Sequence, residues 1–260
     1  MVHLGNELKS IYTLWLREIK RFYRQKSRIV GMIMQPLLFL FIIGTGVSTA
    51  FASRGNFDYL QFMYPGIICM SLLFTSFFSG ISIIIDRQFG FLKEVMVAPI
   101  SRVSIALGKT LGGSTVALFQ GIILLLLAPI LGIQLDILLV LKLIPVMLLI
   151  TFSLTSLGIL FAVPMESMEG FQMIMSFIVM PMFFLSGAFF PMEGVPGWLT
   201  ILMRMDPLTY GVDALRNIFF TGTQGQMMLQ YSLQFNILVL FGFGIIIHLL
   251  AVAGFTLKKE

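Results

Sequence analysis

The sequence predicts an all-α membrane protein with six transmembrane helices. Hydrophobic residues make up 58% of the 260 residues, charged residues make up 11%, and the mean hydropathy is +0.97, which is more apolar surface than one water-soluble core can bury. Six apolar stretches approach the roughly 20 residues that a helix needs to cross a bilayer. These stretches are continuous and lack the alternation of a barrel strand, and backbone groups in lipid must bond within their own segment, so helices are predicted.

The first segment, residues 1–28, is predicted to form an amphipathic helix at the membrane interface. Its apolar residues recur at spacings of three and four, and we expect Trp15 at headgroup depth with the basic face toward anionic lipid. Charges throughout this segment argue against a cleavable signal peptide. Two roles stay open: a topology anchor, or also a surface against which a partner subunit pushes. The apolar face holds Leu4, Leu8, Ile11, Trp15, Ile19 and Phe22, and the opposite face holds Lys9, Thr13, Arg17, Lys20 and Arg24.

The transmembrane domain is predicted to occupy residues 29–260. Small residues in its third span predict close helix contacts, at Gly108, Gly112, Ala117 and Gly121. The six spans are expected near 29–50, 62–85, 106–131, 138–163, 170–190 and 234–256.

The distribution of basic residues predicts that both termini are cytosolic. If the N-terminus is inside, all but four of the 17 basic residues are inside as well, and the exceptions are Arg54, Lys142, Arg204 and Arg216. This asymmetry is the positive-inside pattern, and an even number of spans returns the C-terminus to the same side. The net charge of +5 therefore indicates a membrane surface, and we expect no nucleic-acid partner.

Residues 86–104 form a charged, amphipathic island between the second and third spans. At the cytosolic face, such an island is suited to be gripped by a soluble partner. The alternative is a solvated loop that only serves topology.

The segment from Gly187 to Tyr231 is irregular. Gly187 and Pro191 end the fifth span, and two short apolar pieces follow. We expect two short helices in a V that dips into the outer leaflet, although an ordinary outer loop stays open. Asp206 is the predicted N-cap of the second helix, with Pro207 at its first position.

Several kinds of chemistry find no support in the sequence. Gly108-Lys109-Thr110 imitates the tail of a Walker A loop, but Val103 stands where the first Gly is required. The familiar hydrolase motifs are absent, and Cys69 is the only cysteine. His248 lies alone in the last span, where a packed neutral histidine is expected. Because the spans contain almost no charge, ion-coupled transport is disfavoured.

The order of these features resembles the permease subunits of ABC-2 type transporters, in particular the drug-resistance and lipo-oligosaccharide exporter branch. The resemblance covers essentially the whole chain. Asp206 stands where members of this family usually have Asn. The motifs that carry the resemblance are Phe91–Arg102 followed by Gly108-Lys109, Leu185–Pro191, Asp206–Tyr210 and Ala214–Arg216.

The resemblance implies a role for each motif. Residues 86–104 would be a coupling helix held in a cleft of a cytosolic ATP-binding subunit, with Phe89, Phe91 and Leu92 as apolar anchors. Polar rim contacts would come from Arg87, Lys93, Glu94 and Arg102. The outer hairpin would include Gly187, Pro191, Asp206, Pro207, Tyr210 and Arg216.

The resemblance also implies an assembly. Two ATP-binding subunits would hold ATP and Mg²⁺, this chain would hold no cofactor or metal, and a second permease copy would complete a homodimer in the cell membrane. The first, second and fifth spans would line the path of a drug, lipid or lipid-linked glycan. Polysaccharide export, an ATP-independent channel or carrier, and a membrane-embedded enzyme are the alternatives.

Overall fold

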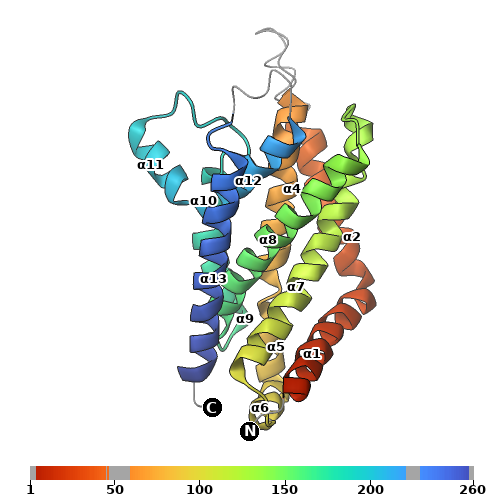
Figure 1. Cartoon of the computed structure of the whole chain (residues 1–260), viewed down its shortest axis with the longest axis vertical. Helices are drawn as coiled ribbons and strands as arrows, with labels where there is room; N and C mark the ends of the chain where they lie inside the picture. The colour runs from red at the N-terminus through yellow and green to blue at the C-terminus, as the bar shows by residue number, and fades with distance from the viewer. Residues whose placement is uncertain (1–3, 45, 47–58, 221–228, 258–260) are drawn as a thin grey trace.

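The computed structural model describes residues 4–44, 46, 59–220 and 229–257, which are helical and contain no strand. The helices form an elongated bundle in which α1 begins and α13 ends at the same end as α6, whereas α11 and α12 lie at the other (Figure 1). We call these the α6 end and the α12 end. The elements are α1 (Leu4–Arg24), α2 (Lys26–Leu38), η1 (Phe39–Gly44), α4 (Tyr59–Phe78), α5 (Ile81–Gln88), α6 (Phe91–Val97), α7 (Arg102–Leu125), η3 (Ala128–Leu131), α8 (Ile137–Ala162), α9 (Met168–Ile174), η4 (Met175–Val179), α10 (Met180–Leu185), α11 (Gly197–Met205), α12 (Pro207–Phe219) and α13 (Leu233–Leu257).

Five helical segments of the described chain are long and apolar enough to cross a membrane, so the chain is a multi-pass membrane protein. They agree with the second to sixth predicted spans to within a few residues. The predicted first span, 29–50, contains α2 and η1, whose apolar stretch Ile29–Ile42 is shorter, and residues 45 and 47–50 lie outside the described ranges. The count of six therefore stays a prediction. The five segments are Tyr59–Gln88, Arg102–Leu125, Ile137–Ala162, Met168–Leu185 and Leu233–Leu257.

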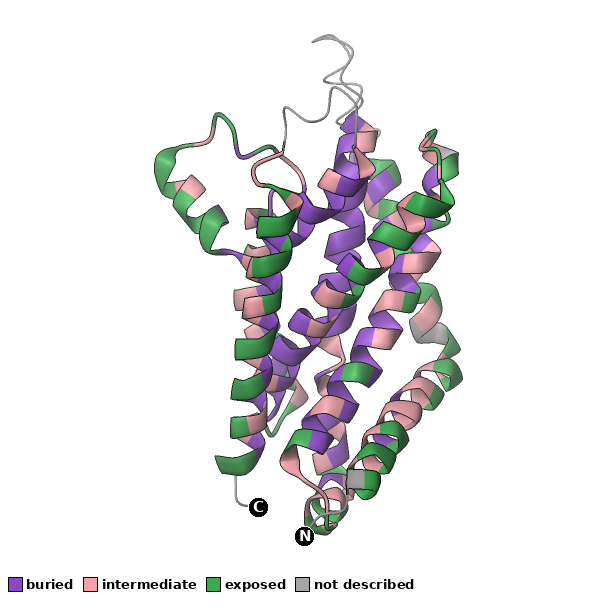
Figure 2. Cartoon of the chain, in the orientation of Figure 1, coloured by how far each residue is buried: buried purple, intermediate pink, exposed green. Residues whose placement is uncertain are grey.

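α4 is the central helix of the bundle, and its side chains are nearly all buried (Figure 2). α7 and α8 pack along it, and α12 packs against it at the α12 end. At the junction of α4 and α5, Gly80 lies against Gly158 of α8: a Cβ on Gly80 would lie 2.5 Å from the Gly158 carbonyl oxygen. These glycines therefore let two spans touch backbone to backbone.

α1 packs along α7 through two glycines. A Cβ on Gly108 would lie 2.8 Å from the Cβ atom of Leu14, and one on Gly112 would lie 2.6 Å from the Cβ atom of Glu18. Gly121 of α7 is equally close to side chains of α4 and α8. The prediction of close contacts at small residues of the third span is thus confirmed at these glycines.

The predicted apolar face of α1 is only partly correct. The side against α7 carries Ile11, Leu14 and Glu18, whereas Leu8 is 62% exposed. The Trp15 indole donates a hydrogen bond to the Thr115 hydroxyl at 3.0 Å. Polar contacts therefore fasten α1 to the third span along with apolar packing, which a two-sided helical pattern alone does not show.

His248 is packed between three spans, as predicted. Its Nδ1 atom lies 3.2 Å from the Ser156 hydroxyl of α8 and 3.4 Å from the Thr110 hydroxyl of α7. The Phe152 ring lies beside it, with centroids 5.2 Å apart. Within the described residues, no group of three or more His, Cys, Asp or Glu side chains is placed to bind a metal ion.

Replacing Gly112 with Leu should detach α1 from α7, because the new side chain would collide with Glu18. We expect overpacking to cost about 1–3 kcal/mol of stability. The melting temperature of the protein in detergent measures this loss. Gly242→Leu is the matched control, since Gly242 lies inside α13 and a Cβ added there would meet no atom within 4 Å. Equal melting temperatures for the two variants would contradict the proposed packing.

Candidate functional site

Charged side chains meet where α1, α5 and α7 converge at the α6 end. Asp86 of α5 accepts two hydrogen bonds from the Arg17 guanidinium, at 2.8 and 2.7 Å. Lys109 of α7 donates to Asp86 and, at 2.6 Å, to Glu18 of α1. The Nη1 atom of Arg21 lies 3.6 Å from Asp86. We call Arg17, Glu18, Arg21, Asp86 and Lys109 the charge cluster.

The charge cluster is largely buried. Asp86 is 2% exposed, Lys109 4% and Glu18 9%. A buried charge is strongly destabilising unless it is paired and hydrogen-bonded, so each of these side chains depends on the others. The hydrogen bonds from Arg17 to Asp86 raise the pKa of the Arg17 guanidinium, which therefore keeps its charge.

The charge cluster corrects the expectation that the spans contain almost no charge. Asp86 lies inside the segment Tyr59–Gln88, and Lys109 lies inside Arg102–Leu125. Ionisable residues inside spans are rare and usually pair with one another. A lysine inside a predicted span, Lys109, was therefore the feature of the sequence that could have indicated this pair.

α6 is a short helix held against the rest of the protein. Gly90 adopts the left-handed conformation, with φ 78°, where the chain turns from α5 into α6. Leu92 is 1% exposed and belongs to the hydrophobic core. The Arg17 guanidinium lies over the Phe91 ring, 3.6 Å from its centroid. The charge cluster and α6 are therefore in direct contact.

The residues predicted to grip a partner divide into two groups. Phe89 is 82% exposed, and Lys93 and Glu94 are exposed beside it. Leu92 and Phe91, predicted as apolar anchors for a partner, instead pack within the chain. Val97, which was not predicted, is 85% exposed and adds a second apolar side chain to this surface.

Arg87 and Arg102 form hydrogen bonds within the chain. Arg87 donates to the carbonyls of Val163, at 2.8 Å, and Met165. Arg102 donates to the Met96 carbonyl at 3.1 Å. Arg87 therefore ties α5 to the connection between α8 and α9, and Arg102 fastens the last turn of α6.

Glu7 of α1 fastens the start of α7. Its carboxylate accepts hydrogen bonds from the backbone N–H of Ser101 at 2.9 Å and from the hydroxyls of Ser101 and Ser104. Ser101 is also the N-cap of α7, because its hydroxyl accepts from the Ser104 N–H. The serine hydroxyls lower the pKa of the Glu7 carboxyl below its ordinary value of 4.5.

At the α12 end, α11 and α12 form the predicted pair of short helices. The Asp206 carboxylate accepts a hydrogen bond from the Leu208 N–H at 2.9 Å, and Pro207 begins α12. The predicted N-cap is thus confirmed. The Thr209 hydroxyl donates to the Met203 carbonyl at 2.7 Å, which fixes α12 against the end of α11.

Arg216 joins this hairpin to the end of the fifth predicted span. It is 5% exposed and donates to the carbonyls of Gly187, at 2.8 Å, and Ala188. Its guanidinium lies over the Phe62 ring of α4, 3.9 Å from the centroid. Its cationic charge is therefore stabilised by carbonyl dipoles and an aromatic face.

The other predicted hairpin residues have local roles. Gly187 has φ 72°, so the chain turns sharply there, and exposed Pro191 follows that turn. The Tyr210 hydroxyl donates to the Arg204 carbonyl at 2.7 Å, and the Tyr210 ring stacks on Tyr231. Asp213, which was not among the predicted hairpin residues, accepts hydrogen bonds from Asn236 of α13 and from the N–H groups of residues 230 and 231.

Asp86→Asn should strongly destabilise the protein, because Lys109 and Arg17 would lose a buried counter-charge. We expect a loss of about 3–5 kcal/mol, measured by unfolding in detergent. Lys20→Gln removes an exposed charge of α1 and is the control. If Asp86→Asn is as stable as Lys20→Gln, the charge cluster contributes nothing to holding α1.

Glu7→Gln should lower the melting temperature at neutral pH but not in acid. Because the folded pKa of Glu7 lies below its ordinary value, the contribution to stability is present above that value and is lost as the pH falls through the folded pKa. Melting temperatures at neutral pH and at about pH 3 test this. The exposed Glu193→Gln is the control, and a difference that does not depend on pH would contradict the assignment.

Comparison with known proteins agrees with this architecture. Residues 9–220 match the family described as ABC-2 type transporter. A transport permease named ycf38 from Cyanophora paradoxa is 30% identical over 217 residues, covering 82% of this chain and 74% of that protein. The inner membrane transport permease YadH of Escherichia coli K12 is 27% identical, covering 83% and 84%. Nodulation protein J of Rhizobium meliloti is 27% identical, covering 74% of each chain. The chain therefore belongs to the ABC-2 type transporter family and is a transport permease of the membrane.

Proposed function

We propose that this chain is the membrane permease of an ATP-driven exporter, and that α6 is the part that an ATP-binding subunit moves. The exposed surface of α6 and of the turn that leads into it carries this proposal. Phe89 and Val97 are large apolar side chains in water-accessible positions, and Lys93 and Glu94 flank them. A protein-binding surface usually has apolar side chains that become buried when the partner binds, surrounded by a charged rim.

The attachment of α6 supports mechanical coupling. Leu92 packs into the hydrophobic core and holds α6 in place, and Phe91 contacts Arg17 of the charge cluster. A displacement of α6 would therefore move α1, α5 and α7 together, because separating them would expose unpaired buried charges. Rigid-body movement of this kind is how closure of two nucleotide-bound subunits would reorient the spans.

We place α6 and both termini on the cytosolic side of the cell membrane. α1 begins and α13 ends at the α6 end (Figure 1), and the positive-inside pattern assigns that end to the cytosol. In this arrangement α11 and α12 form the outer re-entrant hairpin, and α1 lies along lipid headgroups.

The working unit in this proposal contains two permease copies and two ATP-binding subunits. ATP and Mg²⁺ reside in the ATP-binding subunits. One copy offers a thin wall for a pathway, so we place the cargo between two copies of the chain, beside the first, second and fifth spans. Lipid surrounds the remaining faces, such as the exposed side of α13 (Figure 2).

We propose an amphipathic or hydrophobic cargo, such as a drug, lipid or lipid-linked glycan. Polysaccharide export is the nearest alternative. An ion-coupled carrier is disfavoured because Asp86 and Lys109 already neutralise each other.

Phe89→Ala and Glu94→Arg should weaken binding of the ATP-binding subunit and lower cargo-stimulated ATP hydrolysis. For a central apolar contact we expect a loss of about 2 kcal/mol, or roughly 30-fold in affinity. Affinity is measured between the purified subunits, and transport is measured in proteoliposomes.

Leu257→Ala is the matched control, because Leu257 is 83% exposed near the same end of the bundle. Variants of Leu92 are unsuitable, since Leu92 is part of the core. Unchanged affinity and transport in both Phe89→Ala and Glu94→Arg, with normal melting temperatures, would refute the coupling role of α6 and the turn before it.

A further inference from the structure

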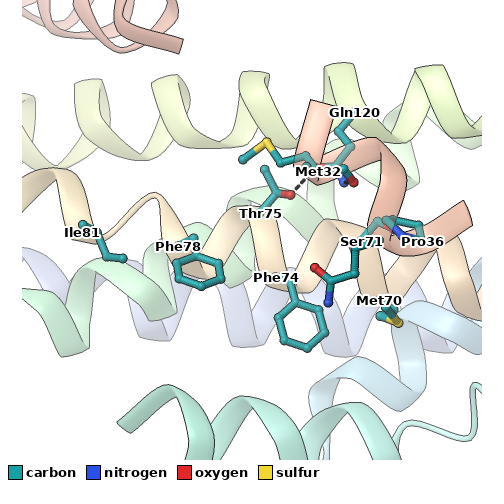
Figure 3. A pocket seen from close by; sticks show the side chains of 11 residues that line it. Met32, Pro36, Met70, Ser71, Phe74, Thr75, Phe78, Ile81 and Gln120 are labelled. Atoms are coloured by element: carbon teal, nitrogen blue, oxygen red, sulfur yellow. Dashed lines mark hydrogen bonds between the residues drawn. The ribbon is translucent and has the colours of Figure 1, made fainter. Parts of the chain in front are cut away.

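A pocket of about 420 Å³ is lined by residues of α2, α4, α5 and α7 (Figure 3). Its volume is in the range of sites that hold drug-sized molecules. Met70, Phe74 and Phe78 of α4 and Met32 of α2 supply much of its apolar lining, and none of its lining residues is charged. Methionine and aromatic side chains adapt well to apolar ligands of varied shape.

One side of this pocket is polar because Pro36 interrupts the hydrogen bonds of α2. Proline has no N–H to offer the carbonyl four residues earlier, which belongs to Met32. Gln120 of α7 supplies the missing donor, and its amide nitrogen lies 2.7 Å from the Met32 carbonyl oxygen. The Thr75 hydroxyl of α4 then donates to the Gln120 carbonyl, as Figure 3 shows. These three residues hold α2, α4 and α7 together beside the pocket.

Gln35 also lines the pocket, and its amide finds no hydrogen-bond partner among the residues that the structure describes. It lies on α2, inside the apolar stretch Ile29–Ile42. Gln35 is exposed, and a primary amide has two donors and one acceptor oxygen that an external group can reach. By contrast, Ser71 already donates its hydroxyl hydrogen to the Ile67 carbonyl. Gln35 is therefore the polar side chain of the pocket that is most available to an external partner.

The apolar side of the pocket continues into an aromatic cluster. The Phe74 ring contacts Phe183 of α10, with centroids 5.9 Å apart, and Phe183 contacts Phe39 of η1 and Phe189. Phe74 therefore connects the pocket lining to aromatic side chains of the first and fifth predicted spans.

We propose that this pocket binds a neutral amphipathic molecule, with its uncharged hydroxyl or amide group on Gln35 and its apolar body against Met70, Phe74 and Phe78. The absence of charged lining residues excludes an ionic headgroup, because nothing in the pocket would compensate its desolvation. Naming this molecule the cargo rests on the export function proposed above. The binding itself does not depend on that export function.

The test uses the full-length permease in phosphatidylcholine nanodiscs with a monoacylglycerol that carries a photoreactive diazirine in its chain. We expect cross-links at Met70, Phe74 and Phe78, competition by unlabelled monoacylglycerol, and no competition by anionic phosphatidylglycerol. Gln35→Leu should weaken labelling about five- to tenfold, the effect of losing one or two hydrogen bonds. Since Gln35 is exposed, this variant should fold normally.

Gln172→Leu is the matched control, because Gln172 is also an exposed glutamine inside a predicted span but does not line this pocket. Cross-links spread evenly over lipid-facing helices, or labelling equal in Gln35→Leu and Gln172→Leu, would overturn the proposal. So would a Gln35→Leu variant that separates permease copies while labelling is unchanged, since Gln35 would then serve subunit contact. Labelling needs no ATP-binding subunit, so its failure and the failure of α6 coupling are separate results.

Discussion

The burial of opposite charges at one point of the bundle is the constraint on which the α6 end depends. Asp86 and Lys109 come from two different spans, and Arg17 and Glu18 come from the N-terminal helix. None of them is stable in that position alone. Because Arg17 also lies over Phe91, the same set of contacts fixes the base of α6. α6 is thus held against three other helices.

The α12 end follows a different rule. Arg216 is buried there without an ion pair to a carboxylate in the described chain, and backbone carbonyls of the turn after α10 receive its hydrogen bonds. Between the two ends, glycines such as Gly80 and Gly158 permit close contact of helices. The bundle therefore has polar contacts at both ends and a mostly apolar middle, in which Gln120 and His248 make hydrogen-bonding contacts between helices.

Local patterns in the sequence were sufficient to predict the five membrane-crossing segments of the described chain and one helix cap. The predicted spans 138–163 and 234–256 differ from α8 and α13 by a single residue at each end, because continuous apolar runs leave a helix in lipid little choice. The cap at Asp206 is equally local. The structure differs from the prediction where packing against distant residues decides the outcome. Leu92 and Phe89 are both apolar residues of the same segment, but Leu92 faces inward and Phe89 faces outward. Arg87 binds carbonyls 76 and 78 residues away, which no local spacing reveals.

The contacts of α1 also have a consequence for biosynthesis. α1 is synthesised before the other described helices, yet its carboxylate at Glu18 can pair with Lys109 only after two further apolar segments have been made. Until then the nascent helix has its charges in water or among headgroups, where they are well solvated. Docking of α1 would therefore occur late in membrane insertion, after the helices up to α7 have reached their final positions.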